Sequence, residues 1–167
     1  MIRAITAVFF LGLGASFLLS LTNYYTQEKI TKNKELHQSQ ILSKLLIDHQ
    51  IEIPETADPM IADCSNWIIR KTVSPGYSGD IESLALIQFR KKGAVLSLRI
   101  TNHNETPGIG DFIDHRKNAW VKQLDNKTKQ EWSAMDMVSG ATITSKAVRT
   151  IAMISFESEG GQCVLLG

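Results

Sequence analysis

The chain has 167 residues, of which 43% are hydrophobic and 21% are charged, and its formal net charge at pH 7 is +1. This length and composition are typical of one globular domain with a small attachment. The near-neutral charge removes the electrostatic argument for binding to nucleic acid.

An uncharged apolar stretch opens the chain. Residues 4–21 carry no charge, and Arg3 is the only charged side chain before them. As a helix that rises about 1.5 Å per residue, this stretch would reach roughly 27 Å, close to the thickness of a membrane's hydrocarbon core. Tyr24 and Tyr25 follow where an interfacial aromatic belt would lie. We therefore predict a transmembrane anchor over residues 1–27.

The anchor is expected to stay on the protein and to place its N-terminus in the cytoplasm. A cleaved signal peptide is the alternative, but Ser20-Leu21-Thr22 is a poor cleavage site. The tail before the span is short and basic, and a folded domain after it can be translocated largely regardless of charge. No cysteine closely follows the apolar stretch, which argues against a lipoprotein anchor. We expect a single-pass membrane protein with an extracytoplasmic domain.

An amphipathic linker helix is predicted over residues 28–52. Apolar residues recur there at roughly helical spacing, namely Ile30, Leu36, Ile41, Leu42, Leu45 and Leu46. Pro54 and Pro59 disfavour a continuation of the helix. The soluble domain is therefore expected over residues 53–167.

The soluble domain contains three runs with strand character, at residues 67–73, 81–90 and 94–101. The last two flank Lys91-Lys92-Gly93, which indicates an antiparallel hairpin. Alternation in the third run predicts that its leucines and Ile100 face the core, with Ser97 and Arg99 outward. A helix is expected over residues 114–124. The predicted fold class is α+β, a small antiparallel sheet packed with helices.

The cysteines and histidines predict no metal site. Cys64 and Cys163 stand near the two ends of the domain, where they could form a disulfide or remain two thiols. They lack C-x-x-C spacing, and the four histidines show no metal-ligand spacing either, at His37, His49, His103 and His115.

A small-residue turn precedes a helical pattern near the C-terminus. Gly140 and Ala141 would let backbone N–H groups approach an anion, and hydroxyl side chains follow at once. The apolar repeat from Ala147 onward predicts a helix that begins at about Ser145. Its free N–H groups and positive dipole end would favour a phosphate at residues 142–144. The alternative is a helix cap without a ligand.

Three segments together with the anchor resemble a known family. They are Pro75-Gly76-Tyr77-Ser78-Gly79, the segment Thr101 to Asp111 with Trp120 after it, and Asp136-Met-Val-Ser-Gly-Ala-Thr142. In this order, over residues 1–152, they resemble the FMN-carrying G subunit of the Rnf-type ion-translocating electron-transport complex. The related C subunit of the sodium-pumping NADH:quinone reductase is the alternative, and the shortness of the chain favours the former.

The resemblance implies that FMN is attached covalently, through its phosphate, to the hydroxyl of Thr142. A separate flavin transferase would recognise Asp136, Ser139, Gly140 and Ala141. The other two loops would enclose the flavin with residues Tyr77, Glu105, Thr106, Pro107, Gly108 and Ile109. Tyr77 and Trp120 could stack on the ring system or could be core aromatics.

The resemblance also implies a protein of the bacterial inner membrane that carries electrons and has no substrate of its own. The FMN would relay electrons between membrane and cytoplasmic partner subunits while the complex moves Na⁺ or H⁺. A free-standing flavoprotein reductase is a further alternative, although no C-x-x-C-H haem motif is present. A non-redox membrane scaffold, in which residues 139–142 only cap a helix, is another.

Overall fold

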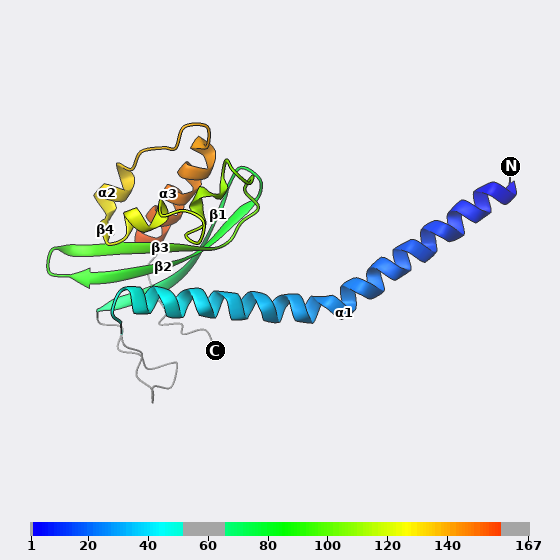
Figure 1. Ribbon diagram of the computed structural model, residues 1–167, viewed down its shortest axis with the longest axis horizontal. Helices are drawn as coiled ribbons and strands as arrows, with labels where there is room; N and C mark the ends of the chain where they lie inside the picture. Colours follow the sequence, from blue (N-terminus) through cyan, green and yellow to red (C-terminus); the bar gives the residue numbers. More distant parts are fainter. Residues whose placement is uncertain (1, 52–65, 158–167) are drawn as a thin grey trace, which may run out of the picture. The chain divides into compact units, whose positions relative to one another are not determined.

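The computed structural model describes residues 2–51 and 66–157, and the chain divides into two units, Met1–Gln40 and Ile41–Gly167. Helix α1, Ile2–Asp48, supplies the first unit and the start of the second (Figure 1). The domain boundary predicted at residue 53 and the cysteines at 64 and 163 lie outside the described residues. The disulfide stays a prediction.

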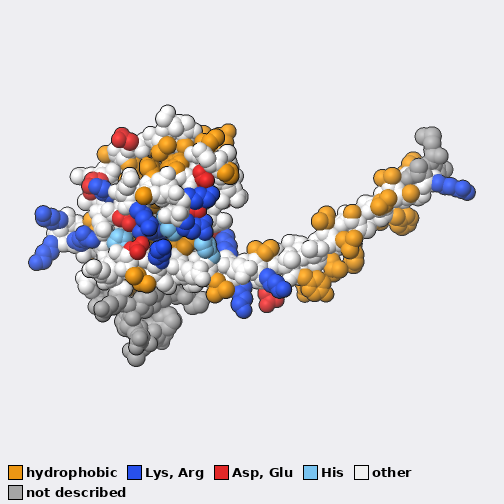
Figure 2. Space-filling model, in the orientation of Figure 1, with side chains coloured by type: hydrophobic (Ala, Val, Ile, Leu, Met, Phe, Trp, Pro, Cys, Tyr) orange, Lys and Arg blue, Asp and Glu red, His pale blue; other side chains and the backbone are white. Residues whose placement is uncertain are grey.

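The N-terminal part of α1 exposes a continuous apolar surface. Figure 2 shows the orange side chains that cover this part of the helix. An unsatisfied polar group is costly in lipid. Two hydroxyls of this helix are satisfied within it, since Thr22 and Thr26 donate to the carbonyls of Leu18 and Thr22 at 2.8 Å each. By length and composition, this helix could cross a membrane.

The domain is built on a four-stranded antiparallel sheet of order β1-β2-β3-β4. Its strands are β1 Trp67–Pro75, β2 Asp80–Arg90, β3 Gly93–Asn102 and β4 Lys127–Thr128. The predicted hairpin is confirmed, with Arg90 opposite Gly93. Gly93 has φ +119°, which side-chain-bearing residues rarely adopt. The α+β fold class is confirmed.

One face of the sheet is covered by α2, Lys129–Ser133, and α3, Thr142–Glu157 (Figure 1). Alternate residues of the strands meet the buried stripe of α3, among them Leu96 and Leu98 against Val148 and Ile151 in one cluster. Trp132 is fully buried in this cluster, and its indole N–H donates to the Leu96 carbonyl at 3.3 Å.

The other face of the sheet is covered by the last turns of α1. These turns bury Ile41, Leu42, Leu45 and Leu46 against Ile69, Leu84 and Leu86. The prediction that Ser97 and Arg99 point outward to solvent is therefore wrong, because both side chains are buried beneath this second layer. The continuous apolar run of residues 84–87 in β2 reflects burial on both faces.

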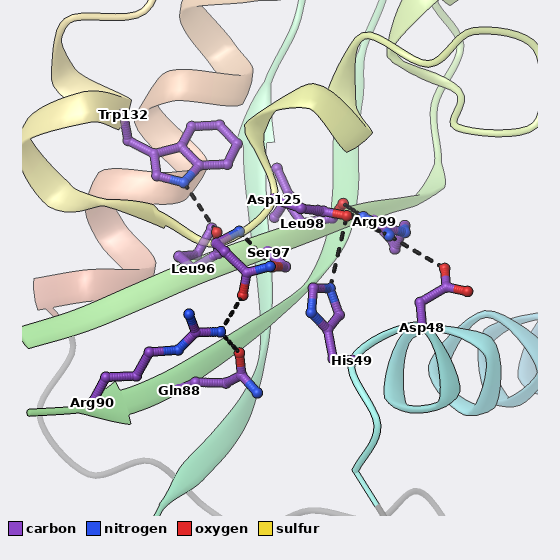
Figure 3. A network of polar contacts seen from close by, with 11 residues as sticks. Asp48, His49, Gln88, Arg90, Leu96, Ser97, Leu98, Arg99, Asp125 and Trp132 are labelled. Carbon is purple, nitrogen blue, oxygen red and sulfur yellow. Dashed lines mark hydrogen bonds and ion pairs between the residues drawn. The ribbon is translucent and has the colours of Figure 1, made fainter.

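Arg99 forms an ion network under the end of α1 (Figure 3). Its side chain is 2% exposed, and it donates to both carboxylate oxygens of Asp125 at 2.7 Å. It also pairs with Asp48 of α1 at 3.4 Å. His49 lies 3.7 Å from Asp125, and burial lowers its pKa despite the attraction of that carboxylate. The network fixes the end of α1 and the segment before β4 to the same strand.

The helix predicted over residues 114–124 is wrong. The segment is irregular up to residue 120 and ends in one 3₁₀ turn, η2 Val121–Leu124; another, η1 Asp111–Ile113, precedes it. The Asp114 carboxylate accepts the backbone N–H of Arg116 at 2.9 Å, and the Asn118 side chain accepts that of Trp120 at 2.9 Å. Such local bonds compete with helical ones. The Arg116 side-chain hydrogen bond also lowers the pKa of Asp114 to about 2.

Replacing Arg99 with Met should lower the free energy of unfolding by about 3 kcal/mol, because the largely buried Asp125 carboxylate would lose the cation that compensates its burial. Tryptophan fluorescence of the full chain during denaturation in detergent would measure this loss. Lys122→Met, which removes an exposed cation close in sequence to Asp125, should change stability by less than about 0.5 kcal/mol. Equal losses in the two variants would contradict the role of the network.

Candidate functional site

A cavity of about 370 Å³ lies where three segments of the domain meet. These segments are the β1–β2 turn, the loop after β3 and the beginning of α3. The lining residues are Tyr77, Glu105, Thr106, Ile109, Gly110, Gly140, Ala141, Thr142, Ile143 and Thr144. The sheet positions two of the segments, since they follow the ends of β1 and β3.

Glu105 ties the three segments together. Its side chain is 4% exposed, and one carboxylate oxygen accepts the backbone N–H groups of Tyr77 and Ser78 at 2.9 and 3.1 Å. The other oxygen accepts the hydroxyl of Thr144 at 2.5 Å. Hydrogen bonds to a charged acceptor are about twice as strong as neutral ones, so this side chain fixes the cavity walls.

Glycine is required beside this carboxylate. A Cβ on Gly110 would lie 2.8 Å from the Glu105 Cβ and 2.9 Å from its Oε2. A Cβ on Gly76 would lie 2.7 Å from the Ile81 side chain. Real Cβ atoms do not approach so closely, so larger residues at these positions would displace the buried glutamate.

The loop after β3 closes on itself. The Thr106 carbonyl accepts the N–H groups of Ile109 and Gly110 at 3.1 and 2.8 Å. Gly108, with φ +77°, donates its N–H to Asp111 at 2.8 Å. Lys117 and this backbone bond lower the pKa of Asp111. The result is a tight turn that presents Ile109 at the cavity.

Helix α3 begins at Thr142, one turn earlier than the predicted start at about Ser145. Gly140, with φ +80°, turns the chain into the helix. The buried Ser145 hydroxyl accepts the N–H of Val138 at 3.1 Å and donates to the Ala141 carbonyl at 2.9 Å. The N–H groups of Thr142 to Thr144 belong to the first turn, which leaves them without helical partners.

Most of the predicted site residues come together at the cavity. Tyr77, Glu105, Thr106, Ile109, Gly140, Ala141 and Thr142 line it. Asp136, Ser139, Pro107 and Gly108 lie outside its lining, and all four are exposed. Trp120 packs edge-to-face on Phe112, with ring centroids 4.7 Å apart, and is a partly buried core aromatic.

Sequence reasoning placed a phosphate at residues 142–144 but did not single out Gly110, Ile143 and Thr144 as residues of the flavin site, and all three line the cavity. Thr144 could have been found, because it precedes Ala147, Val148 and Ile151 at helical spacing and so belongs to the buried face of α3. Its side chain is 2% exposed, whereas that of Thr142 is exposed to solvent. The two hydroxyls therefore have different roles.

Glu105 is the one charged side chain among the described residues that line the cavity. The described part of the chain holds no group of three or more His, Cys, Asp or Glu side chains placed to bind a metal ion. The site thus combines free helix N–H groups, which suit a phosphate, with the apolar side chains of Tyr77, Ile109 and Ile143.

Comparison with known proteins assigns this arrangement to a family. The family model for an FMN-binding domain matches residues 76–154, which include the whole cavity lining. The G subunit of the ion-translocating oxidoreductase complex of Shewanella loihica is 32% identical over 162 residues, covering 78% of this chain and 76% of the relative. The chain belongs to this family of G subunits.

The same protein from other bacteria is also similar. That of Shewanella piezotolerans is 30% identical over 162 residues, covering 78% of this chain and 76% of the relative. That of Salmonella typhimurium is 35% identical over 111 residues, covering 60% and 51%. The predicted resemblance to this family is confirmed. The residues of the cavity fit FMN, since they offer N–H donors for a phosphate and apolar surface for a ring system.

Ser145→Ala should destabilise the domain by about 1 kcal/mol, because the partly buried N–H of Val138 would lose its partner. Ser133→Ala is the matched control, since this exposed hydroxyl only donates to the Gln130 carbonyl of its own helix, and it should cost less than about 0.5 kcal/mol. Chemical denaturation of both full-length variants would measure the difference. A Ser145→Ala protein as stable as Ser133→Ala would contradict this role of the turn.

Proposed function

We propose that this protein is an electron-transfer subunit that carries FMN as a phosphoester on Thr142, within a membrane-bound, ion-translocating complex. The observation that carries the proposal is the position of Thr142. Its exposed hydroxyl stands at the N-terminus of α3, beside the cavity of an FMN-binding domain. When bound, FMN supplies one- and two-electron chemistry, and the protein supplies binding and orientation.

The chain's own groups account for binding. The first-turn N–H groups of α3 and its positive dipole end would hold the phosphate. Tyr77, Ile109 and Ile143 offer apolar surface for the ring system, and all three are largely exposed. Glu105 holds their segments at a fixed separation through its hydrogen bonds.

Exposure accounts for the choice of hydroxyl. The Thr142 oxygen can reach a second protein, whereas the Thr144 hydroxyl is buried and already donates to Glu105. A threonine hydroxyl is a weak nucleophile at its free pKa, so a flavin transferase would provide the base. The Thr142 oxygen would bond to the flavin-side phosphorus of a flavin dinucleotide as its pyrophosphate bond breaks, and the nucleoside monophosphate would leave. Its recognition elements would be the exposed residues Asp136, Ser139 and Gly140 with the adjoining Ala141.

The wild-type protein, co-expressed with a flavin transferase, should gain the mass of FMN less one water. Thr142→Ala should lack this adduct, since no hydroxyl remains at the position. Thr142→Ser, which keeps a hydroxyl, and Thr144→Ala, which removes the neighbouring one, should both carry it. Intact-mass spectrometry of the four proteins makes the comparison. An adduct that persists in Thr142→Ala would contradict the attachment site, and an unmodified wild type would favour the scaffold alternative.

The proposed topology places the N-terminus in the cytoplasm and the flavin domain outside, with the apolar N-terminal part of α1 as the span. Support comes from Arg3, a cation directly before this apolar part. Partners would be the other subunits of the complex, because the relatives carry the name of one component of such an assembly.

A membrane-impermeant maleimide should label Lys92→Cys in intact bacteria, because the exposed tip of the β2–β3 hairpin would lie outside the cytoplasm. The experiment uses a chain whose own Cys64 and Cys163 are replaced by Ser. Ile2→Cys in the same background is the control, and it should react only after lysis. The reverse labelling pattern would contradict the topology.

A further inference from the structure

We propose that Glu105 lowers the midpoint potential of the bound FMN, in addition to holding the cavity loops together. The inference rests on the proposed function, because it concerns the flavin held at Thr142. It assigns an electrostatic role to a side chain whose hydrogen bonds alone would make it a structural residue.

The position of the carboxylate is fixed. Glu105 is the acceptor in all three of its side-chain hydrogen bonds. The donors are the backbone N–H groups of Tyr77 and Ser78 and the hydroxyl of Thr144, and an ionised carboxylate can accept all of them. It lines the cavity directly. Rotation of the side chain would break these bonds, so the charge keeps its place against the cavity.

The charge of Glu105 has no cationic partner. Within residues 2–51 and 66–157 it forms no ion pair, in contrast to Asp125 or Asp114, each of which contacts an arginine. The rest of the described lining is uncharged. A carboxylate in a partly buried site without a counter-ion acts over a longer range than a paired one, because less solvent and no opposite charge screen it.

A fixed negative charge disfavours reduction of a neighbouring flavin. Reduction adds electrons to the ring system, and a carboxylate on the cavity wall repels the added charge, as charges near the flavin ring generally tune its potential. The N-terminus of α3 acts in the opposite direction with about half a positive charge. The full charge of Glu105, bonded to Thr144 in the same turn, outweighs that partial charge.

The magnitude follows from Coulomb's law. Two unit charges about 10 Å apart, at an effective dielectric constant of about 20, change an equilibrium that creates one of them about tenfold. A tenfold change corresponds to about 30 mV for a two-electron couple. Removal of the charge should therefore raise the midpoint potential by about that amount.

Glu105→Gln separates the charge from the hydrogen bonds. The amide oxygen can still accept from the β1–β2 turn, and the Thr144 hydroxyl can rotate to accept from the amide nitrogen. Glu157→Gln is the matched control. Glu157 ends α3, is 63% exposed and pairs with Lys129 of α2. It lies thirteen positions after Thr144, which is about 20 Å along the helix axis.

The experiment is a spectroelectrochemical titration of the full-length flavinylated proteins in detergent, after intact-mass spectrometry has measured their FMN content. We expect Glu105→Gln to have a midpoint potential higher than wild type by about 30 mV. Glu157→Gln should remain at the wild-type value. A Glu105→Gln potential that equals or lies below that of wild type would overturn the inference.

Two further measurements keep the outcomes distinct. If Glu105→Gln does not fold, as its thermal transition would show, Ile109→Lys tests the same wall of the cavity, because it adds a cation without removing the glutamate. It should also raise the potential, and an unchanged value would overturn the inference. A wild-type protein without FMN would refute the proposed function itself, whereas loaded proteins of equal potential would refute only the role of Glu105.

Discussion

Two apolar layers, one on each face of the antiparallel sheet, hold the strands of this domain in register. The α3 side buries Val148 and Ile151, and the α1 side buries Leu45 and Leu46. Each fully buried aliphatic side chain contributes roughly 1.5–3 kcal/mol, so neither layer is dispensable to a domain of this size. The cavity depends on this arrangement, because the ends of β1 and β3 and the first turn of α3 bring its walls together.

Glu105 shows how a structural bond and an electronic effect can reside in one side chain. Burying a carboxylate costs several kcal/mol, and hydrogen bonds to a charged group return about 1.5–3 kcal/mol each. An amide could accept from the same N–H groups at a lower desolvation cost. The three bonds that Glu105 accepts together offset this cost, so one charge can hold the loops and also act on a bound cofactor.

The openness of the site bears on why the cofactor would be covalently attached. Tyr77, Ile109 and Ile143 at the cavity are largely exposed, so the cavity buries only part of any ligand. Tight non-covalent sites usually bury most of the ligand surface. A phosphoester on Thr142 would keep FMN in a site too shallow to retain it and would leave the ring system accessible to a redox partner.

The sequence by itself determined the apolar span, the strands, the hairpin and the motif that ends at Thr142, because each depends on local periodicity, turn chemistry or short spacing. The resemblance to the family also depends on short segments of sequence. It pointed to the loops of the cavity, because Tyr77 and Glu105 lie in two of the segments that carry the resemblance. Local patterns also misled. The helix expected over residues 114–124 does not form, because the side chains of Asp114 and Asn118 bond to the backbone there.

Only the tertiary structure decided what covers the sheet and which side chains meet. Alternation in β3 indicates that the strand has two faces. It cannot show that the end of α1, about fifty residues earlier, covers the face that carries Ser97 and Arg99. Arg99 was therefore expected in solvent, whereas it lies between Asp48 and Asp125. The bond between Glu105 and Thr144 joins residues 39 positions apart. No local pattern encodes such a contact, because it exists only once the sheet has brought the loop and the helix to the same edge.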